Sequence, residues 1–153
     1  DTSTNDTVLI FANGKSGTPP IVEGTLEARL FQKALETLCV YLTKELARDG
    51  EGATKLVAIT VTGAHTTSEA KQAARAVANS PLVKTAVHGG DPNWGRLVAV
   101  AGRSGVGFDL THALVRIGTV ELFRNERIFP DREPAAAEHL GPAPARDEIL
   151  IFN

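Results

Sequence analysis

The chain has 153 residues, enough for one hydrophobic core or for one domain with part of another. Its 16 basic and 18 acidic residues nearly cancel and form no cluster of the kind that nucleic-acid binding uses, so we expect no nucleic-acid partner. No apolar run approaches the roughly 20 residues that span a bilayer, and the N-terminus lacks the pattern of a signal peptide, so we expect a cytoplasmic protein without a membrane partner.

The first half of the chain predicts a strand, a long helix and a second strand. Val8–Ala12 is a short apolar run that ends in turn residues. From Glu27 to Arg48, apolar residues recur at the spacing of an amphipathic helix, and Cys39 lies in that pattern as an expected buried thiol in a reducing compartment. The β-branched residues from Lys55 to Thr62 predict a buried strand.

The next helix begins at a capping box, Thr66-x-x-Glu69, presents a face of small residues, and ends at Ser80-Pro81. Leu82–His88 is β-branched and bounded by Pro and Gly-Gly, so we predict a strand there. Asp91-Pro92 then has the pattern of a helix start, with Asp91 as N-cap and Pro92 at the first helical position, for a helix that runs through Asn93 to about Ala101 and closes at Gly102.

The last third of the chain predicts three strands and one helix. The strands are Val115–Phe123, its hairpin partner Arg127–Phe129, and Glu148–Phe152. A short helix over Glu133–Leu140 tolerates its proline because the proline falls in the first turn. The alternation of strands and helices predicts α/β or α+β layers, with a mixed sheet packed by helices.

The run from Ser80 to Arg96 sets the only tryptophan, Trp94, among small, turn-forming and charged residues. Such a segment is typical of a binding site or an interface. The alternative is a tight turn into a helix, with Trp94 as a packing anchor.

Three motifs occur in a fixed order along the chain. They are Asp1–Val8 (Asp-Thr-Ser-Thr-Asn-Asp-Thr-Val), Glu51–Lys55 (Glu-Gly-Ala-Thr-Lys) and the Ser80–Arg96 run. Together they resemble the bifunctional ornithine acetyltransferases, also called glutamate N-acetyltransferases. The resemblance covers about the first two thirds of the chain and is weak beyond Gly107.

The resemblance implies that the chain is part of the second chain of an enzyme that cuts itself in two. The nucleophile of that family is the threonine that opens the second chain, and we expect it upstream of Asp1, so this sequence contains no catalytic residue. The oxyanion-hole Thr-Gly of the family belongs to the N-terminal chain, and its C-terminal substrate residues have no counterpart up to Asn153. We therefore expect the 153 residues alone to be inactive.

The implied scaffold is that of the self-cleaving ornithine acetyltransferases and related aminopeptidases. In it, residues 1–54 would be part of the catalytic domain, and residues 55–153 would be a C-terminal α/β domain truncated at its end.

Glu51 lies between two glycines at the junction of the long helix and the following strand. A carboxylate on such a loop can face a bound molecule, although a solvated turn glutamate is the more common case. The matching glutamate of the family contacts the substrate amino acid, so the resemblance makes Glu51 the candidate substrate-binding residue. A carboxylate that faces an ammonium forms a charge-assisted hydrogen bond.

Other polar groups have weaker patterns. The hydroxyl-rich cluster Thr2–Asp6 is compatible with an acyl-transfer centre, but turn capping is its more common role. The four histidines (His65, His88, His112 and His139) have no metal-ligand spacing, so we expect no metal site. Gly102, Gly105 and Gly107 do not form a phosphate loop, because the Lys-Ser/Thr ending is missing, and we expect no cofactor.

The resemblance implies an acetyltransferase of arginine biosynthesis that moves an acetyl group from N-acetylornithine to glutamate through an acetyl-threonine enzyme. The expected small-molecule partners are N-acetylornithine, ornithine, glutamate and N-acetylglutamate. The expected protein partner is the N-terminal chain of the same precursor, in a hetero-oligomer such as a heterotetramer. Two alternatives stay open: a self-processing aminopeptidase or amidohydrolase, and an interaction module that lacks the nucleophile.

Overall fold

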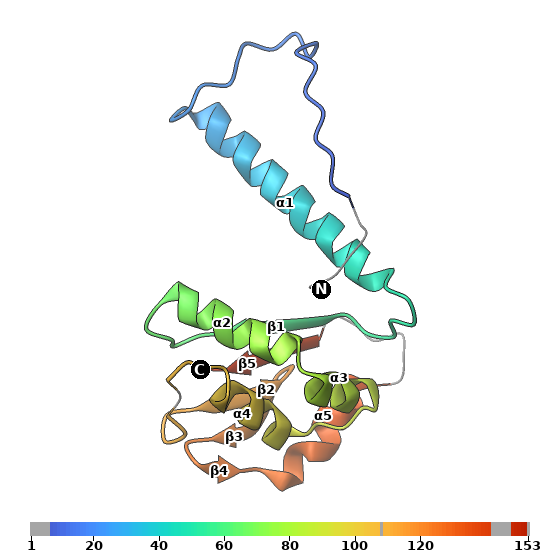
Figure 1. The fold of residues 1–153 in the computed structure, drawn as a ribbon, viewed down its shortest axis with the longest axis vertical. Helices are drawn as coiled ribbons and strands as arrows, with labels where there is room; N and C mark the ends of the chain where they lie inside the picture. Colours follow the sequence, from blue (N-terminus) through green and yellow to red (C-terminus); the bar gives the residue numbers. More distant parts are fainter. Residues whose placement is uncertain (1–6, 108, 142–147, 153) are drawn as a thin grey trace. The chain divides into compact units, whose positions relative to one another are not determined.

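The chain divides into two compact units, Asp1–Glu51 and Gly52–Asn153. The structure, a computed structural model, describes residues 7–107, 109–141 and 148–152 (Figure 1). The two units differ in how much apolar surface they bury.

The first unit contains one long helix, α1 (Leu26–Arg48), which confirms the helix predicted from Glu27 to Arg48. The helix begins where the Thr25 hydroxyl accepts a hydrogen bond from the Ala28 N–H, at 3.2 Å. It ends at Asp49, whose N–H donates to the Glu45 carbonyl at 3.0 Å. Local capping therefore sets both ends of α1.

None of the residues of α1 is buried, and the apolar residues before it are exposed as well. The strand predicted over Val8–Ala12 was wrong for this chain: residues 7–12 have no regular structure, and Phe11 is 86% exposed. A strand forms only when another strand satisfies its backbone groups, and the described part of this unit has no other strand. The prediction of a buried Cys39 was wrong for a related reason, because none of the described residues of this unit covers the side chain, and Cys39 is exposed.

The second unit is built on a sheet of five strands in the order β1-β5-β2-β3-β4. The strands are β1 (Val57–Val61), β2 (Leu114–Ile117), β3 (Val120–Arg124), β4 (Arg127–Ile128) and β5 (Glu148–Phe152). β1 and β5 pair in parallel, whereas β5 with β2, β2 with β3, and β3 with β4 pair antiparallel. This confirms the predicted mixed sheet and the predicted strand over Glu148–Phe152. β1 is shorter than predicted, and it is half-buried rather than buried.

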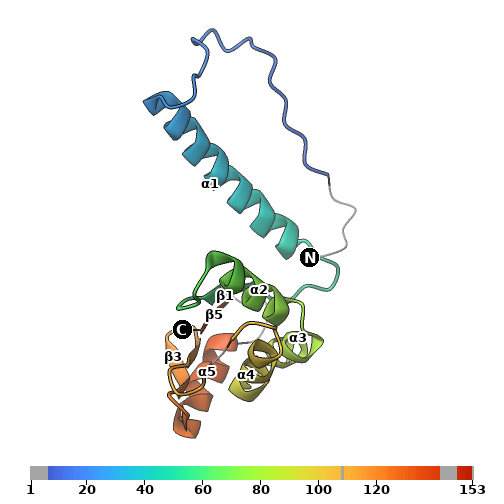
Figure 2. The ribbon, with the colours of Figure 1, turned by 60° about the vertical axis from the view of Figure 1, so that its left-hand side comes forward.

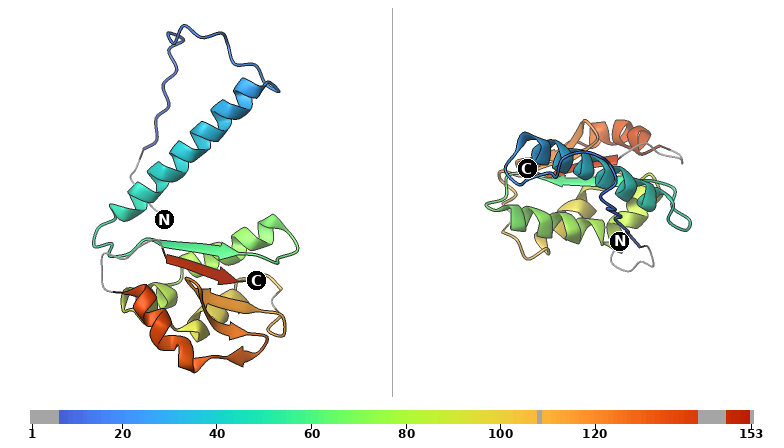
Figure 3. Two further views of the ribbon diagram at one scale, coloured as in Figure 1. Left: turned by 180° about the vertical axis from the view of Figure 1, so that it is seen from behind. Right: turned by 90° about the horizontal axis from the view of Figure 1, so that it is seen from above.

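Helices cover both faces of this sheet. They are α2 (Thr67–Ala78), α3 (Pro81–His88), α4 (Trp94–Gly102), the 3₁₀ turn η1 (Pro130–Arg132) and α5 (Glu133–Leu140). α2, α3 and α4 pack against one another (Figure 2), and α5 lies on the opposite face of the sheet from α2 (Figure 3). The arrangement is an α+β fold with a mixed sheet packed by helices, and the helix predicted over Glu133–Leu140 is confirmed.

The capping box predicted for α2 is present in full. The Thr66 hydroxyl accepts from the Glu69 N–H at 3.1 Å, and the Glu69 carboxylate accepts from the Thr66 N–H at 3.0 Å. The small-residue face of α2 is the buried one, where Ala73 and Val77 contribute to the core.

The strand predicted over Leu82–His88 was wrong, because the segment is the helix α3. Pro81 is in its first turn, where a missing N–H costs no hydrogen bond. Val83, Ala86 and Val87 are buried, and their spacing of three and four residues places them on one helical face. Burial of that face outweighs the strand preference of the β-branched residues.

The strand predicted over Val115–Phe123 is in fact the hairpin of β2 and β3. Ile117 pairs with Val120, so only two residues, Gly118 and Thr119, form the connection. Gly118, the first of the two turn residues, has φ = +57°. Two-residue hairpin turns require a positive φ at this position, and glycine adopts it readily. The predicted hairpin into β4 is confirmed, with Asn125 and Glu126 as its turn.

The helix predicted to start at Asp91-Pro92 begins two residues later. Asn93 is its N-cap, and its side chain accepts from the Arg96 N–H at 3.1 Å. The Asp91 carboxylate instead accepts from the Asn93 side chain at 3.1 Å. Asp91 is therefore not the N-cap itself but holds the side chain of the N-cap residue, Asn93.

The core of the second unit joins the inner faces of the helices to the sheet. Its largest fully buried side chains are Val77, Val100, Val115, Ile117, Leu122 and Leu140. They come from α2, α4, β2, β3 and α5, so elements from both ends of the unit share one core. In the part of the chain that the structure describes, no helix is long and apolar enough to cross a membrane.

Trp94 is half-buried at the start of α4 and stacks on Phe123 of β3, with ring centroids 5.3 Å apart and planes at 19°. The contact joins a helix to the sheet and adds ring stacking to apolar burial. Trp94 is therefore a packing anchor.

We expect Trp94→Ala in the full-length protein to lower the free energy of unfolding by about 2–3 kcal/mol, somewhat less than for a fully buried aromatic ring. Trp94→Phe keeps a ring against Phe123 and should lose about half as much or less. Urea unfolding of the three proteins measures both values. Equal stability of Trp94→Ala and the wild type would show that the stacked contact contributes nothing.

Candidate functional site

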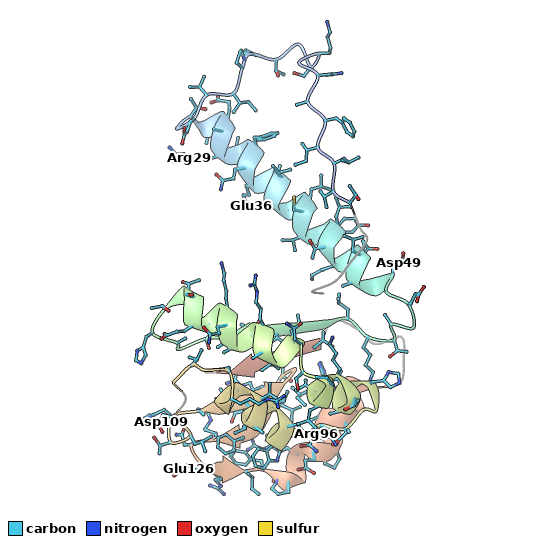
Figure 4. The ribbon with its side chains drawn as sticks, viewed as in Figure 1. Arg29, Glu36, Asp49, Arg96, Asp109 and Glu126 are labelled. Atoms are coloured by element: carbon cyan, nitrogen blue, oxygen red, sulfur yellow. The ribbon has the colours of Figure 1, made fainter. Side chains whose placement is uncertain are left out.

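Glu51 lies in the exposed loop between α1 and β1. It follows Asp49, the C-cap of α1, and precedes Gly52, which has φ = +68° and no atom within 4 Å of where a Cβ would lie (Figure 4 labels Asp49). Among the residues that the structure describes, none forms a hydrogen bond with the Glu51 carboxylate. The carboxylate is therefore available to a ligand.

The downstream end of this loop is tied to the C-terminal end of α3. The Thr54 hydroxyl forms a hydrogen bond with His88 Nδ1 at 3.1 Å, and Lys55 Nζ donates to the Val87 carbonyl at 2.7 Å. The carbonyl end of a helix carries partial negative charge, so an ammonium group is favourable there. Two consecutive residues of the Glu51–Lys55 motif thus contact one helix end.

A cavity of about 440 Å³ opens beside these contacts. Its lining comes from the segment before β1, the end of α3 and the end of α5: Thr54, Lys55, His88, Gly89, Gly90, Ala137, Glu138 and Gly141. Lys55, His88 and Glu138 bring an ammonium, an imidazole and a carboxylate to its wall. Such a wall can pair with both charges of an amino acid.

The polar residues of the Ser80–Arg96 run mostly hold two helices together. Arg96 Nη1 donates to the Leu82 carbonyl at 3.2 Å and to the Thr85 hydroxyl at 3.3 Å, which ties α4 to α3 (Figure 4 labels Arg96). The Asp91 N–H donates to the Ala86 carbonyl at 2.9 Å and closes the turn between them. Only its His88-Gly89-Gly90 corner lines the cavity. The packing role of Trp94 agrees with the alternative reading of this run.

A second cavity, of about 350 Å³, lies at the carboxyl end of β1. It is lined by Val61–His65, by Ala73 and Val77 of α2, and by residues after α4 that include Ser104 and Asp109. Hydrogen bonds from the Thr111 hydroxyl and N–H, and then from His112, lower the pKa of Asp109 to about 2. Asp109, labelled in Figure 4, is therefore an anion at neutral pH, already satisfied by its own loop.

The histidines have different contacts. His88 contacts Thr54 and His112 contacts Asp109, while both His65 and His112 line the second cavity. Across the described residues, no group of three or more His, Cys, Asp or Glu side chains is placed to hold a metal ion. Gly102 is the last residue of α4, so the glycines after it lie at a carbonyl end and have no N–H groups of a helix start to offer a phosphate. The Thr2–Asp6 cluster lies outside the described residues.

The sequence reasoning singled out Glu51 but missed the contacts made by its neighbours. Thr54 and Lys55 were part of the motif, whereas His88 was considered only as a possible metal ligand. The pairing joins residues 34 and 32 positions apart, which a single sequence does not reveal. Glu138, at the end of α5, carried no sequence signal.

Comparisons with known proteins agree with one another. Residues 1–151 match the family model described as "ArgJ family". The "Arginine biosynthesis bifunctional protein ArgJ" of Symbiobacterium thermophilum is 49% identical over 153 residues, which is 100% of this chain and 37% of that protein. The "Glutamate N-acetyltransferase Oat2" of Streptomyces clavuligerus is 41% identical over 157 residues, with 99% of this chain and 37% of that protein covered.

A solved structure shares the fold. The crystal structure of "Arginine biosynthesis bifunctional protein argJ" from Bacillus halodurans superimposes with a TM-score of 0.90 at 36% identity, and covers 100% of this chain and 71% of that one. The chain spans about a third of the length of the curated relatives that it matches. Family model, relatives and structure thus point the same way, and the chain belongs to the ArgJ family.

Proposed function

We propose that the chain is part of an acetyltransferase of arginine biosynthesis that moves an acetyl group from N-acetylornithine to glutamate. The observation that carries the proposal is the alignment of nearly the whole chain with a protein named for glutamate N-acetyl transfer. The relatives named as arginine-biosynthesis bifunctional proteins support the same pathway. The exposed Glu51 carboxylate supports it as well, because both substrates are amino acids or their derivatives.

The chemistry divides into two transfers. A threonine hydroxyl, expected upstream of Asp1, attacks the acetyl carbonyl of N-acetylornithine; a C–O bond forms, the amide C–N bond breaks, and ornithine leaves with the proton of the hydroxyl. The amine of glutamate then attacks the ester carbonyl, a C–N bond forms, and the C–O bond breaks to restore the hydroxyl. The ester holds the acetyl group between the steps, so the route needs no metal or organic cofactor.

In this scheme Glu51 binds the ammonium of the substrate amino acid. Its carboxylate is exposed, and the Glu51–Lys55 loop ends against a cavity that carries both signs of charge. A carboxylate and an ammonium form a charge-assisted hydrogen bond, which is strong once a bound substrate excludes water.

We further propose that the enzyme cleaves itself into two chains and works in the cytoplasm as a hetero-oligomer, such as a heterotetramer. The Bacillus halodurans chain supports the cleavage, because this sequence covers 71% of that chain but only 37% of the Symbiobacterium thermophilum protein. That solved chain is thus much shorter than the full-length relative. In the proposed enzyme, residues 1–54 belong to the catalytic domain and residues 55–153 to the C-terminal domain.

Two other functions compete with this one. An aminopeptidase or amidohydrolase on the same scaffold would pass its acyl group to water, and the name of the Streptomyces clavuligerus relative favours an amino acid as acceptor instead. A non-catalytic interaction module would have no use for a substrate-binding Glu51.

We expect Glu51→Gln in the full-length enzyme to lower kcat/KM for N-acetylornithine and glutamate by about ten- to a hundredfold, because it keeps the shape and removes the charge that holds the ammonium. That loss corresponds to about 1.5–3 kcal/mol of transition-state binding. Self-cleavage should persist, since it needs no substrate. Steady-state kinetics and denaturing gels measure the two properties.

Glu23→Gln is the matched control, because Glu23 is also exposed, lies in a turn, and precedes a glycine of positive φ. It should leave kcat/KM unchanged. If Glu51→Gln retains wild-type kcat/KM for both substrates, Glu51 is a solvated turn residue and its proposed role is lost.

The N-terminal chain of the precursor is the partner that we propose for the first unit. Leu26, Leu30, Leu38, Leu42 and Leu46 follow one another at multiples of four residues, so they form one stripe that winds around α1, and each is more than 40% exposed. Soluble proteins rarely leave such a continuous apolar stripe in water. The remaining two thirds of the protein supply the surface that covers it.

We expect Leu38→Gln in the full-length protein to lower the free energy of unfolding by about 2–3 kcal/mol, since it would place an amide in a covered apolar interface. Lys33→Gln, an exposed substitution on the same helix, should change it by less than about 0.5 kcal/mol. Denaturant unfolding of both variants makes the comparison. Equal effects would mean that the stripe of α1 stays in water.

A further inference from the structure

We propose that Thr54, Lys55 and His88 are positioning residues that hold the Glu51 loop in the conformation that binds substrate. The inference deepens the proposed function and rests on the role given there to Glu51. It starts from two contacts, Thr54 with His88 Nδ1 at 3.1 Å and Lys55 Nζ with the Val87 carbonyl at 2.7 Å, which together we name the α3 clasp.

The loop needs such an anchor because its own conformation is weakly constrained. Residues 49–53 are all exposed, and Gly52 has open space around it. Glycine has more conformational freedom to lose than any other residue, so a loop of this kind samples many arrangements. A loop that has to order itself when substrate arrives binds that substrate less tightly.

The α3 clasp limits that freedom at the downstream end of the loop, because Thr54 and Lys55 are held against α3. Glu51 is three residues from Thr54, so its Cα stays within about 11 Å of the Thr54 Cα. On the upstream side, the Asp49 N–H closes the last turn of α1, so residues 50–53 are the short segment between that helix and Thr54. Fixing the downstream end of so short a segment restricts where the Glu51 carboxylate can lie relative to α3.

The two contacts of the α3 clasp differ in kind. Lys55 is half-buried and charged, and its acceptor lies at the carbonyl end of α3, so this contact is the stronger one. Thr54 and His88 meet at the exposed rim of the 440 Å³ cavity, where a hydrogen bond adds little to folding stability. Loss of the rim contact should therefore change substrate binding far more than it changes the stability of the fold.

The test uses the full-length, self-cleaved enzyme and pairs of variants at each rim position. Thr54→Val removes the hydroxyl at nearly constant shape, and Thr54→Ser restores it. His88→Ala removes the imidazole, and His88→Asn keeps a polar atom near the position of Nδ1. Thr60→Val, at an exposed threonine of β1, is the matched control for loss of a hydroxyl.

Two readouts are taken for each protein: kcat and KM for glutamate with N-acetylornithine as donor, and the rate of amide hydrogen exchange in peptides covering residues 49–56. We expect Thr54→Val and His88→Ala to raise KM about 5- to 20-fold with kcat changed by less than about twofold, and to speed exchange in the loop. Thr54→Ser, His88→Asn and Thr60→Val should behave like the wild type. The double variant Thr54→Val/His88→Ala should have no higher KM and no faster loop exchange than either single variant, because each single variant already removes the same hydrogen bond.

The readouts separate this inference from the proposed function. Unchanged loop exchange in Thr54→Val and His88→Ala overturns the α3 clasp, whatever the enzyme does with acetyl groups. Faster exchange with unchanged KM in an active enzyme overturns its role in positioning Glu51. A wild-type enzyme that transfers no acetyl to glutamate removes the proposed function, and the exchange rates then decide alone whether the α3 clasp orders the loop.

Discussion

The pairing of β5 between β1 and β2 is the constraint on which the second unit depends. β5 pairs in parallel with β1 over Val57–Val61 and antiparallel with β2 over Val115–Ile117. Within the described residues β1 has no other strand partner, so the strand that directly follows the Glu51–Lys55 loop joins the sheet only through β5. The geometry of the Glu51 loop therefore depends on residues almost a hundred positions further along the chain.

The two units depend on the rest of the protein to different degrees. The second unit has its own core, in which side chains from α2, α4, α5 and the sheet bury one another. In the first unit, by contrast, none of the described residues is buried, although apolar residues line α1 and the segment before it. Hydrophobic burial is the main favourable term in folding, so the first unit needs surface from outside itself. This agrees with a sequence that spans about a third of its curated relatives.

The sequence predicted those elements whose signals are local. The apolar period of α1, the capping box at Thr66 and the first-turn proline of α5 each act within a few residues, and each prediction was confirmed. The predictions that failed depend on tertiary context. Leu82–His88 is helical because three of its residues face a core, and Val8–Ala12 forms no strand because the described part of its unit has no other strand. The break at Gly118 was missed because apolar, β-branched residues continue on both sides of it.

The candidate site shows the same difference between local sequence signals and long-range contacts. Glu51 stood out because its motif is contiguous and resembles a family, and membership of the ArgJ family is shown by the comparisons. The contacts of Thr54 and Lys55 with the end of α3 were not predictable, because they join distant residues through side chains. The loop could thus be identified from a local motif, whereas its contacts with α3 could be identified only from the fold.

The most direct test of the account follows the acetyl group itself. The full-length enzyme is incubated with N-acetylornithine labelled in its acetyl group, together with unlabelled glutamate, and the label is traced by mass spectrometry. The account predicts that the label leaves N-acetylornithine and appears in N-acetylglutamate, with ornithine released in equal amount. Label recovered as free acetate would identify a hydrolase, and label that stays in N-acetylornithine would contradict any acetyl transfer by this protein.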